Sequence, residues 1–414
     1  MTERRILTTH VGSLVRPDDF AALLRRRMSG GVDDSEYLPA LASSVEQVVA
    51  DQVEAGVDVV SDGEYGKGIG WEQYVLERLD GFGPRVQLAT DTGGVGFGDF
   101  ARFAEFYGEL WPKENYLEGI YPCVGPIKYT GHAALARDIA NLQAAMKKAG
   151  ATDGFLPVAA PASAFAMSPN QHYETDEEYM FAGAEALREE YKTIVDAGLF
   201  VQIDDAHLPF MYDRMVPPAT AADFKRWARI RVDALNHALR GLPAERIRYH
   251  ICWGSWNGPH TSDVPLKQIV DLLLRVRAGS YSIEAANARH EHEWQVWKSV
   301  KLPDGRKLIP GVVSHQTNVV EHPELVAERI LRFARIVGRD NVLAGTDCGF
   351  AQGPFVRRVH PSIQWAKLQT LATGARLASA ALWKAGRRRP ARAKRAVGKK
   401  AARPKKAARK KRRT

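Results

Sequence analysis

The sequence predicts an α/β protein and, within that class, a (β/α)8 TIM barrel. Short β-rich runs alternate with longer amphipathic stretches, the pattern of parallel strands covered by helices. Nearly every apolar run ends in a polar residue, as strands do at the catalytic mouth of such a barrel. The rival architecture, a doubly wound open sheet, lacks its usual nucleotide fingerprints, since neither G-x-G-x-x-G after the first strand nor G-x-x-x-x-G-K-[ST] occurs.

Nine segments are predicted as strands, one more than the barrel needs, so either 121–129 or 155–159 is an extra element. Helical periodicity fills the intervals between the strands. The predicted strands are 6–11, 57–61, 121–129, 155–159, 199–203, 247–251, 281–283, 309–313 and 341–344. The main predicted helices are 40–55, 133–148, 176–196, 221–239, 266–277, 323–337 and 362–383.

Two segments do not fit the alternation. The stretch 80–118 is rich in glycine and aromatic residues, and we interpret it as an inserted hairpin or lid over one face of the barrel. The segment 384–414 is a low-complexity Lys/Arg/Ala tail that cannot bury an apolar face, so we expect it to be disordered. The expected domains are therefore a catalytic barrel over 1–383 and this tail.

The net charge of +10 belongs to the tail alone. Of the 58 Lys and Arg residues, 17 lie in 384–414, which contains no acidic residue. Residues 1–383 therefore carry 41 basic against 48 acidic groups, a net charge of −7. The body gives no electrostatic reason to bind nucleic acid, whereas the tail could contact a polyanion non-specifically or could be an extension without a role.

The composition also bears on the compartment. The chain of 414 residues is 45% hydrophobic and contains no apolar run long enough to span a membrane. Its N-terminus lacks a signal-type apolar stretch. The three cysteines, Cys123, Cys252 and Cys348, are too few for a disulfide scaffold and suit a reducing environment. We expect a cytoplasmic protein without membrane contact.

A metal site is the strongest chemical signal in the sequence. His250 and Cys252 stand two residues apart on one strand, so both side chains point to the same side. Glu284 and Cys348 end two later strands. Imidazole, carboxylate and two thiolates suit a tetrahedral Zn²⁺ ion. The alternative is that both cysteines are buried structural thiols.

A zinc ion held by two thiolates has little Lewis acidity left for activating water. It can still lower the pKa of a substrate thiol and hold it as a nucleophilic thiolate at neutral pH. The ligand set therefore favours transfer of an alkyl group to a thiol over hydrolysis.

Seven short motifs, in order over roughly 6–380, resemble the catalytic barrel of cobalamin-independent methionine synthase and its shorter relatives, which include epoxyalkane:coenzyme M transferase. One departure is that Ala206-His207 follows the second aspartate, where the family usually has a proline. The matching motifs are TTHVGS (8–13), VSDGE (60–64), VQIDD (201–205), HIC (250–252), SIE (282–284), PGVVSHQTN (310–318) and DCG (347–349).

The resemblance implies roles for individual residues. Zinc would be held by His250, Cys252, Glu284 and Cys348. The amino-acid part of homocysteine would be held by Ser13, Glu64 and Asp204, because two carboxylates can bind an ammonium group. His315 would be the acid that protonates the departing group.

The motifs and the charge pattern leave three functions open. The first is methyl transfer from 5-methyltetrahydrofolate to homocysteine, which makes methionine. The second keeps the zinc site but opens an epoxide with a sulfonate-bearing thiol such as coenzyme M. The third, from a different class, is a nucleic-acid-associated protein that acts through its basic tail.

Overall fold

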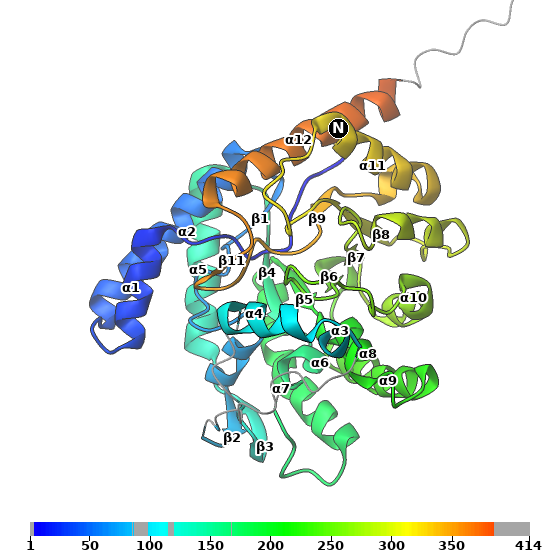
Figure 1. The fold of residues 1–414 in the computed structure, drawn as a ribbon. Helices are drawn as coiled ribbons and strands as arrows, with labels where there is room; N and C mark the ends of the chain where they lie inside the picture. Colours follow the sequence, from blue (N-terminus) through cyan, green and yellow to red (C-terminus); the bar gives the residue numbers. More distant parts are fainter. Residues whose placement is uncertain (1–3, 85, 87–97, 115–119, 167, 385–414) are drawn as a thin grey trace, which may run out of the picture.

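A curled parallel sheet forms the centre of the molecule, which is a computed structural model describing residues 4–84, 86, 98–114, 120–166 and 168–384 (Figure 1). Most of its strand residues are buried, because helices cover the outside and side chains fill the inside. The strands, in spatial order, are β1 (Val59–Ser61), β4 (Asp153–Ala159), β5 (Phe200–Asp204), β6 (Ile247–Ile251), β7 (Ser280–Ile283), β8 (Lys307–Val313) and β9 (Gly345–Thr346).

The N-terminal segment closes this sheet into a barrel. Thr8 forms a parallel bridge with Ala344, next to β9, and Thr9 forms one with Val59 of β1. The amide of Thr9 donates to the carbonyl of Ala344 at 2.9 Å, and the amide of Val59 donates to that of Thr8 at 3.1 Å. The segment takes the place of the eighth strand, although its paired part is shorter than the predicted 6–11. The predicted barrel is confirmed.

The surplus strand is identified as well. Residues 155–159 belong to β4 of the barrel, whereas β3 (Cys123–Tyr129) pairs in antiparallel fashion with β2 (Leu79–Phe82) outside it. The predicted insertion is therefore present, but its described part contains two helices, and the paired strands β2 and β3 lie at its two ends.

Helices surround the barrel, and those over 176–196 and 323–337 have the predicted bounds (Figure 1). Several begin at a side-chain cap: Thr175 and Glu178 form a reciprocal capping box, and so do Thr220 and Asp223. The long helices are α1 (Asp18–Met28), α2 (Asp34–Glu54), α5 (His132–Ala149), α7 (Asp176–Asp196), α9 (Ala221–Ala238), α10 (Leu266–Arg275), α11 (Pro323–Val337) and α12 (Pro361–Lys384).

Two helices of the insertion, α3 (Gly98–Arg102) and α4 (Ala104–Glu114), lie across the barrel in the view of Figure 1. The Asp99 carboxylate accepts hydrogen bonds from the Thr261 amide and the Ser262 hydroxyl. The Tyr107 hydroxyl accepts from the indole N–H of Trp256 at 3.1 Å. Both contacts join the insertion to the loop that follows β6.

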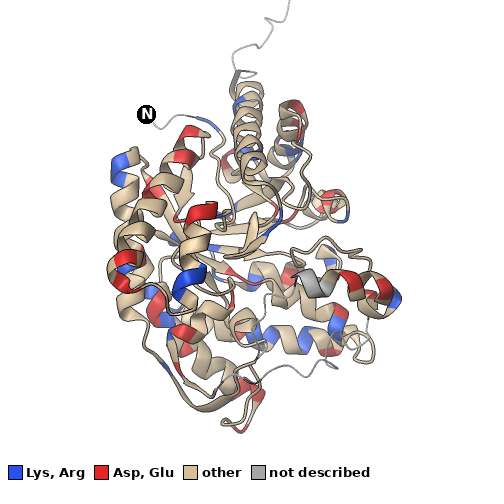
Figure 2. Cartoon of the chain, turned by 60° about the vertical axis from the view of Figure 1, so that its left-hand side comes forward, with Lys and Arg blue, Asp and Glu red and all other residues tan. Residues whose placement is uncertain are grey.

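Acidic and basic residues are interspersed over the outer helices in the view of Figure 2, in keeping with the mildly acidic body expected from the sequence. Among the described residues, no helix has the length and apolar character needed to cross a bilayer. The predicted disordered tail begins at Lys384, the last residue of α12, and 385–414 lie outside the described residues.

Candidate active site

A cavity opens at the end of the barrel where the parallel strands finish. Six of the eight predicted site residues line it, and they come from loops or strand ends around the barrel: Ser13, Glu64, Asp204, His250, Cys252 and Cys348. Glu284 and His315 are buried but do not line the cavity. The convergence of residues distant in sequence follows from the parallel strands, whose carboxyl ends meet at one rim.

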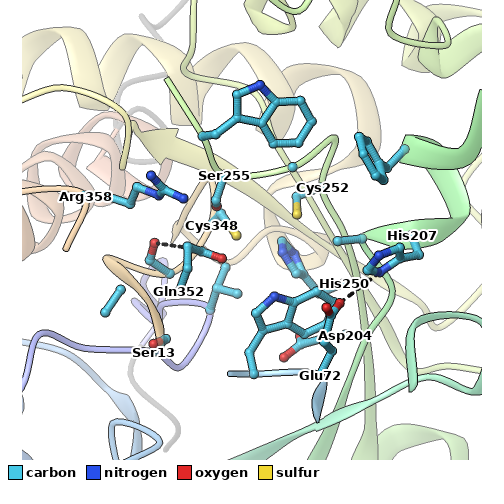
Figure 3. Close-up of a pocket in the computed structure, with 18 of the residues that line it drawn as sticks. Ser13, Glu72, Asp204, His207, His250, Cys252, Ser255, Cys348, Gln352 and Arg358 are labelled. Carbon is cyan, nitrogen blue, oxygen red and sulfur yellow. Dashed lines mark hydrogen bonds and ion pairs between the residues drawn. The ribbon is translucent and has the colours of Figure 1, made fainter. Parts of the chain in front are cut away.

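Three potential metal ligands gather at the base of this cavity. One nitrogen of His250 and the sulfurs of Cys252 and Cys348 all lie within 4.8 Å of one another. Figure 3 shows the two sulfurs side by side, with the imidazole close to them. The Nδ1 atom of His250 lies 3.2 Å from the Ser282 hydroxyl, and its buried Nε2 has no hydrogen-bond partner among the described residues. A soft donor set with an unpartnered imidazole nitrogen fits a metal ion.

The surroundings of the cluster favour the thiolate form of one cysteine, Cys348. The contact between the two cysteines lowers the pKa of Cys348 well below its usual value and raises that of Cys252. Burial disfavours a charge on His250, but the neighbouring Cys348 and Asp204 together outweigh burial and raise the pKa of the imidazole. A sulfur able to carry negative charge beside an imidazole is the state a metal ligand requires.

Glu284 lies at the end of β7, outside the three-residue group. Its carboxylate accepts from the Trp253 amide at 3.2 Å and from the side-chain amide of Asn287. It is close enough to Cys252 to raise the pKa of that thiol. The structure therefore places the predicted fourth ligand next to the cluster, engaged with other partners.

The predicted substrate-binding acids lie on one side of the cavity. The Asp204 carboxylate accepts from the Gln202 amide at 2.8 Å, and burial raises its pKa to about 7. Glu64 has a left-handed backbone, with φ of 63°. Burial raises its pKa too, although the Lys67 ammonium lies 3.4 Å from its Oε2.

Arg16 supports this loop, since its guanidinium donates to the backbone carbonyls of Glu64 and Lys67. Ser13 also lines the cavity, and its backbone carbonyl accepts from the Phe350 amide at 2.9 Å. Neither Arg16 nor Lys67 was predicted, because a side chain that holds a loop leaves no periodic signal in the sequence.

His315 reaches the cavity through another residue. Its Nε2 lies 2.9 Å from the hydroxyl of Ser255, which lines the cavity after β6. Burial lowers the pKa of His315 to about 4. Its Nδ1 has no hydrogen-bond partner among the described residues. Ser255 was not predicted, and only its position three residues after Cys252 could have suggested it.

With the geometry established, known proteins provide a comparison. Residues 158–363 match the catalytic domain of cobalamin-independent synthases. The chain belongs to the cobalamin-independent methionine synthase family. The matched segment contains the His250, Cys252 and Cys348 cluster and ends within α12. Membership of this family indicates an enzyme of methyl transfer.

Full-length relatives of the family are similar over most of this chain. A 2-hydroxypropyl-CoM lyase from Xanthobacter autotrophicus is 24% identical over 92% of this chain and 96% of its own length. A methionine synthase from Sulfolobus acidocaldarius is 25% identical over 83% and 85%. The structure of a B12-independent methionine synthase from Shewanella sp. W3-18-1, in complex with selenomethionine, superposes with a TM-score of 0.68 at 19% identity, covering 91% of this chain and 99% of that one. The last comparison supports the fold.

The two cysteines of the cluster predict a direct test of metal binding in this family member. We expect Cys252→Ser to lower the affinity for Zn²⁺ by at least about tenfold, because a serine hydroxyl is a far weaker ligand than a thiolate. Cys123→Ser is the matched control, since Cys123 is buried in β3 outside the cluster. Equilibrium dialysis followed by elemental analysis measures both variants. Equal zinc content in the two would contradict the assignment.

Proposed function

We propose that this chain is a zinc-dependent transferase that moves a methyl or other alkyl group to a substrate thiol. The observation that carries the proposal is the buried group of His250, Cys252 and Cys348 at the base of a cavity lined by Glu64 and Asp204. A hydrolase would need a metal with open Lewis acidity, whereas two thiolate ligands favour holding a substrate sulfur as its anion.

The ligands we propose are His250, Cys252, Cys348 and Glu284. When bound there, zinc would lower the pKa of the substrate thiol and keep it nucleophilic at neutral pH. His250 is held at Nδ1 by the Ser282 hydroxyl, which leaves Nε2 available. We include Glu284 because its buried carboxyl lies within electrostatic range of Cys252.

The remaining side chains would bind the substrates and supply the proton. Glu64 and Asp204 are proposed to hold an ammonium group, and Ser13 a carboxylate. As the thiolate sulfur forms its bond to the donor carbon, the electron pair of the breaking bond goes to the departing atom, which must then take a proton. We assign delivery of that proton to His315, acting through the hydroxyl of Ser255 at 2.9 Å. Because burial lowers the pKa of the imidazole to about 4, the neutral ring would relay a proton taken up at Nδ1 rather than store one.

The substrates we place first are 5-methyltetrahydrofolate and homocysteine, with methionine as the product. The second candidate is an epoxide with coenzyme M, and two observations favour it. The CoM lyase from Xanthobacter autotrophicus is similar over 92% of this chain. In addition, the Lys67 ammonium 3.4 Å from Glu64 already balances one carboxylate, which reduces the cavity's preference for an ammonium-bearing thiol.

A four-way assay separates these candidates. The zinc-loaded protein is offered homocysteine or coenzyme M, each with 5-methyltetrahydrofolate or epoxypropane, and products are identified by mass spectrometry. Methionine from the first pair supports the leading proposal, and 2-hydroxypropyl-coenzyme M supports the second. An absence of thioether product from all four pairs would reject both.

We propose that the catalytic unit is 1–383 and that the tail 384–414 is dispensable for transfer. All proposed site residues lie between Ser13 and Cys348, and the barrel's last helix, α12, ends at Lys384. Truncation after Lys384 should leave zinc content and transfer unchanged. Any DNA binding should be lost with the tail and should weaken steeply with added salt. Loss of transfer on truncation would place the boundary elsewhere.

His315 gives the sharpest prediction about the mechanism. We expect His315→Asn to lower kcat by about 10²–10⁴-fold, because the departing atom loses its proton donor. Zinc content and thiol affinity should not change, since the histidine is neither a proposed ligand nor in the cavity wall. Steady-state kinetics, zinc analysis and thiol titration test the three statements separately. Loss of zinc would instead make His315 a ligand, and normal turnover would remove it from the mechanism.

A further inference from the structure

Two titratable residues of the cavity wall have no role in the proposed function. Glu72 stands just before the short helix Gln73–Glu77, after β1, and His207 begins α8 (His207–Met215), after β5. Both line the cavity that contains the two sulfurs, as do Trp71 and Phe210. Figure 3 shows Glu72 and His207 together, on the same side as Asp204. His207 also lies in the Ala206-His207 departure noted in the sequence.

The contact between them requires a proton. Glu72 Oε2 lies 3.1 Å from His207 Nδ1, and neither of these buried atoms has a hydrogen-bond partner among the described residues. A carboxylate oxygen and an unprotonated imidazole nitrogen are both acceptors and repel each other at this distance. The pair is therefore stable only when one proton lies between the two atoms.

The surroundings favour a single proton in the pair. Burial raises the pKa of Glu72 to about 8, although Arg214 opposes the shift. Burial, assisted by Arg214, lowers the pKa of His207 to about 3. At neutral pH the protonated carboxyl of Glu72 then donates to Nδ1, and the ring hydrogen of the neutral imidazole is at Nε2.

The Nε2 atom is the free end of this pair. It makes no hydrogen bond to the described residues, while the ring lies against Trp71 with centroids 6.0 Å apart and edge-on to Phe210 at 5.8 Å. The charged or titratable groups around the pair are Arg214, from α8, and Asp204, from the end of β5. An N–H in the cavity wall beside two aromatic side chains suits a ligand with an apolar body and one hydrogen-bond acceptor.

We propose that His207, with its proton held at Nε2 by Glu72, donates a hydrogen bond to the alkyl donor and determines which donors are accepted. This inference rests on the proposed function, because it assigns the donor to the same cavity. The donor class is an apolar or flat molecule with an accepting nitrogen or oxygen near the atom that departs. A reduced heterocyclic amine and an epoxide both meet this description.

Kinetics of variants tests the role in donor binding. We expect His207→Phe and Glu72→Leu to raise the KM for the donor by about tenfold while leaving the KM for the thiol unchanged, since each removes one oriented hydrogen bond. Glu72→Gln should restore the wild-type KM, because its amide N–H can also donate to Nδ1. The control is Glu189→Gln, which changes an exposed carboxylate 3.5 Å from His132. An unchanged donor KM in both His207→Phe and Glu72→Leu would overturn the proposal.

The pH dependence distinguishes this role from a purely structural one. Above pH 8 Glu72 becomes ionised and accepts from His207, so the ring proton moves to Nδ1 and Nε2 no longer donates. The wild-type donor KM should therefore rise as the pH passes through about 8, whereas that of Glu72→Gln should stay flat. The same rise in Glu72→Gln would contradict the proposal.

A second readout does not depend on turnover. In ¹⁵N spectra of the zinc-loaded full chain, the His207 signals are those missing from His207→Phe. We expect the Nε2–H tautomer at pH 7, conversion to Nδ1–H above about pH 8 only when Glu72 is present, and a shift of the Nε2 signal on adding 5-methyltetrahydrofolate or epoxypropane. An Nδ1–H tautomer at pH 7, or no shift with either donor, would refute the inference. These signals without any transfer activity would refute the proposed function alone.

Discussion

A buried arginine inside the barrel holds together the two parts of the chain on which the site depends. The guanidinium of Arg248, on β6, donates to the hydroxyl of Thr9 at 3.0 Å and to the carbonyl of His10 at 2.9 Å. It also lies 3.8 Å above the ring of Phe155. Because strand side chains alternate, Arg248, His250 and Cys252 share one face. Arg248 lies deepest in the barrel, and Cys252 lies nearest the carboxyl ends of the strands, at the base of the cavity. The bonds of Arg248 thus fix β6 against the N-terminal segment that closes the barrel and leads to Ser13.

The cavity above this layer combines a polarised sulfur cluster with acids that burial keeps close to neutral. Asp204 and Glu72 have pKa values raised to about 7 and about 8, so the wall carries less negative charge near neutral pH than its composition suggests. The thiolate that we propose as substrate would therefore meet little electrostatic repulsion from the cavity wall. The side with the sulfur cluster favours a thiolate, whereas the side with Asp204 and Glu72 favours protonated carboxyls.

The parts predicted from sequence are those that depend on local periodicity. The alternation of strands and helices, the shared face of His250 and Cys252, and the convergence of strand ends all follow from the two-residue repeat of a strand and the parallel topology. The predicted first strand, 6–11, lies in the right place but is too long, since the structure forms isolated bridges at Thr8 and Thr9. Long-range pairing, not the run of β-favouring residues, sets its length.

Sequence periodicity does not predict the contacts that loops make. The partners of Glu284, the Ser255–His315 contact and the Lys67–Glu64 pair all depend on backbone conformations that no repeat encodes, such as the left-handed φ of Glu64. Glu72 and His207 are 135 positions apart in the chain and meet only because β1 and β5 end at the same rim.

Zinc K-edge X-ray absorption of the zinc-loaded protein, with and without a saturating thiol, would show whether the metal binds the substrate sulfur. We expect two sulfur ligands at about 2.3 Å in the protein alone. A third sulfur should appear when homocysteine or coenzyme M is added, because the metal at His250, Cys252 and Cys348 would bind the substrate thiolate. A zinc ion without sulfur ligands, or a sulfur count that neither thiol changes, would contradict thiolate activation at this site.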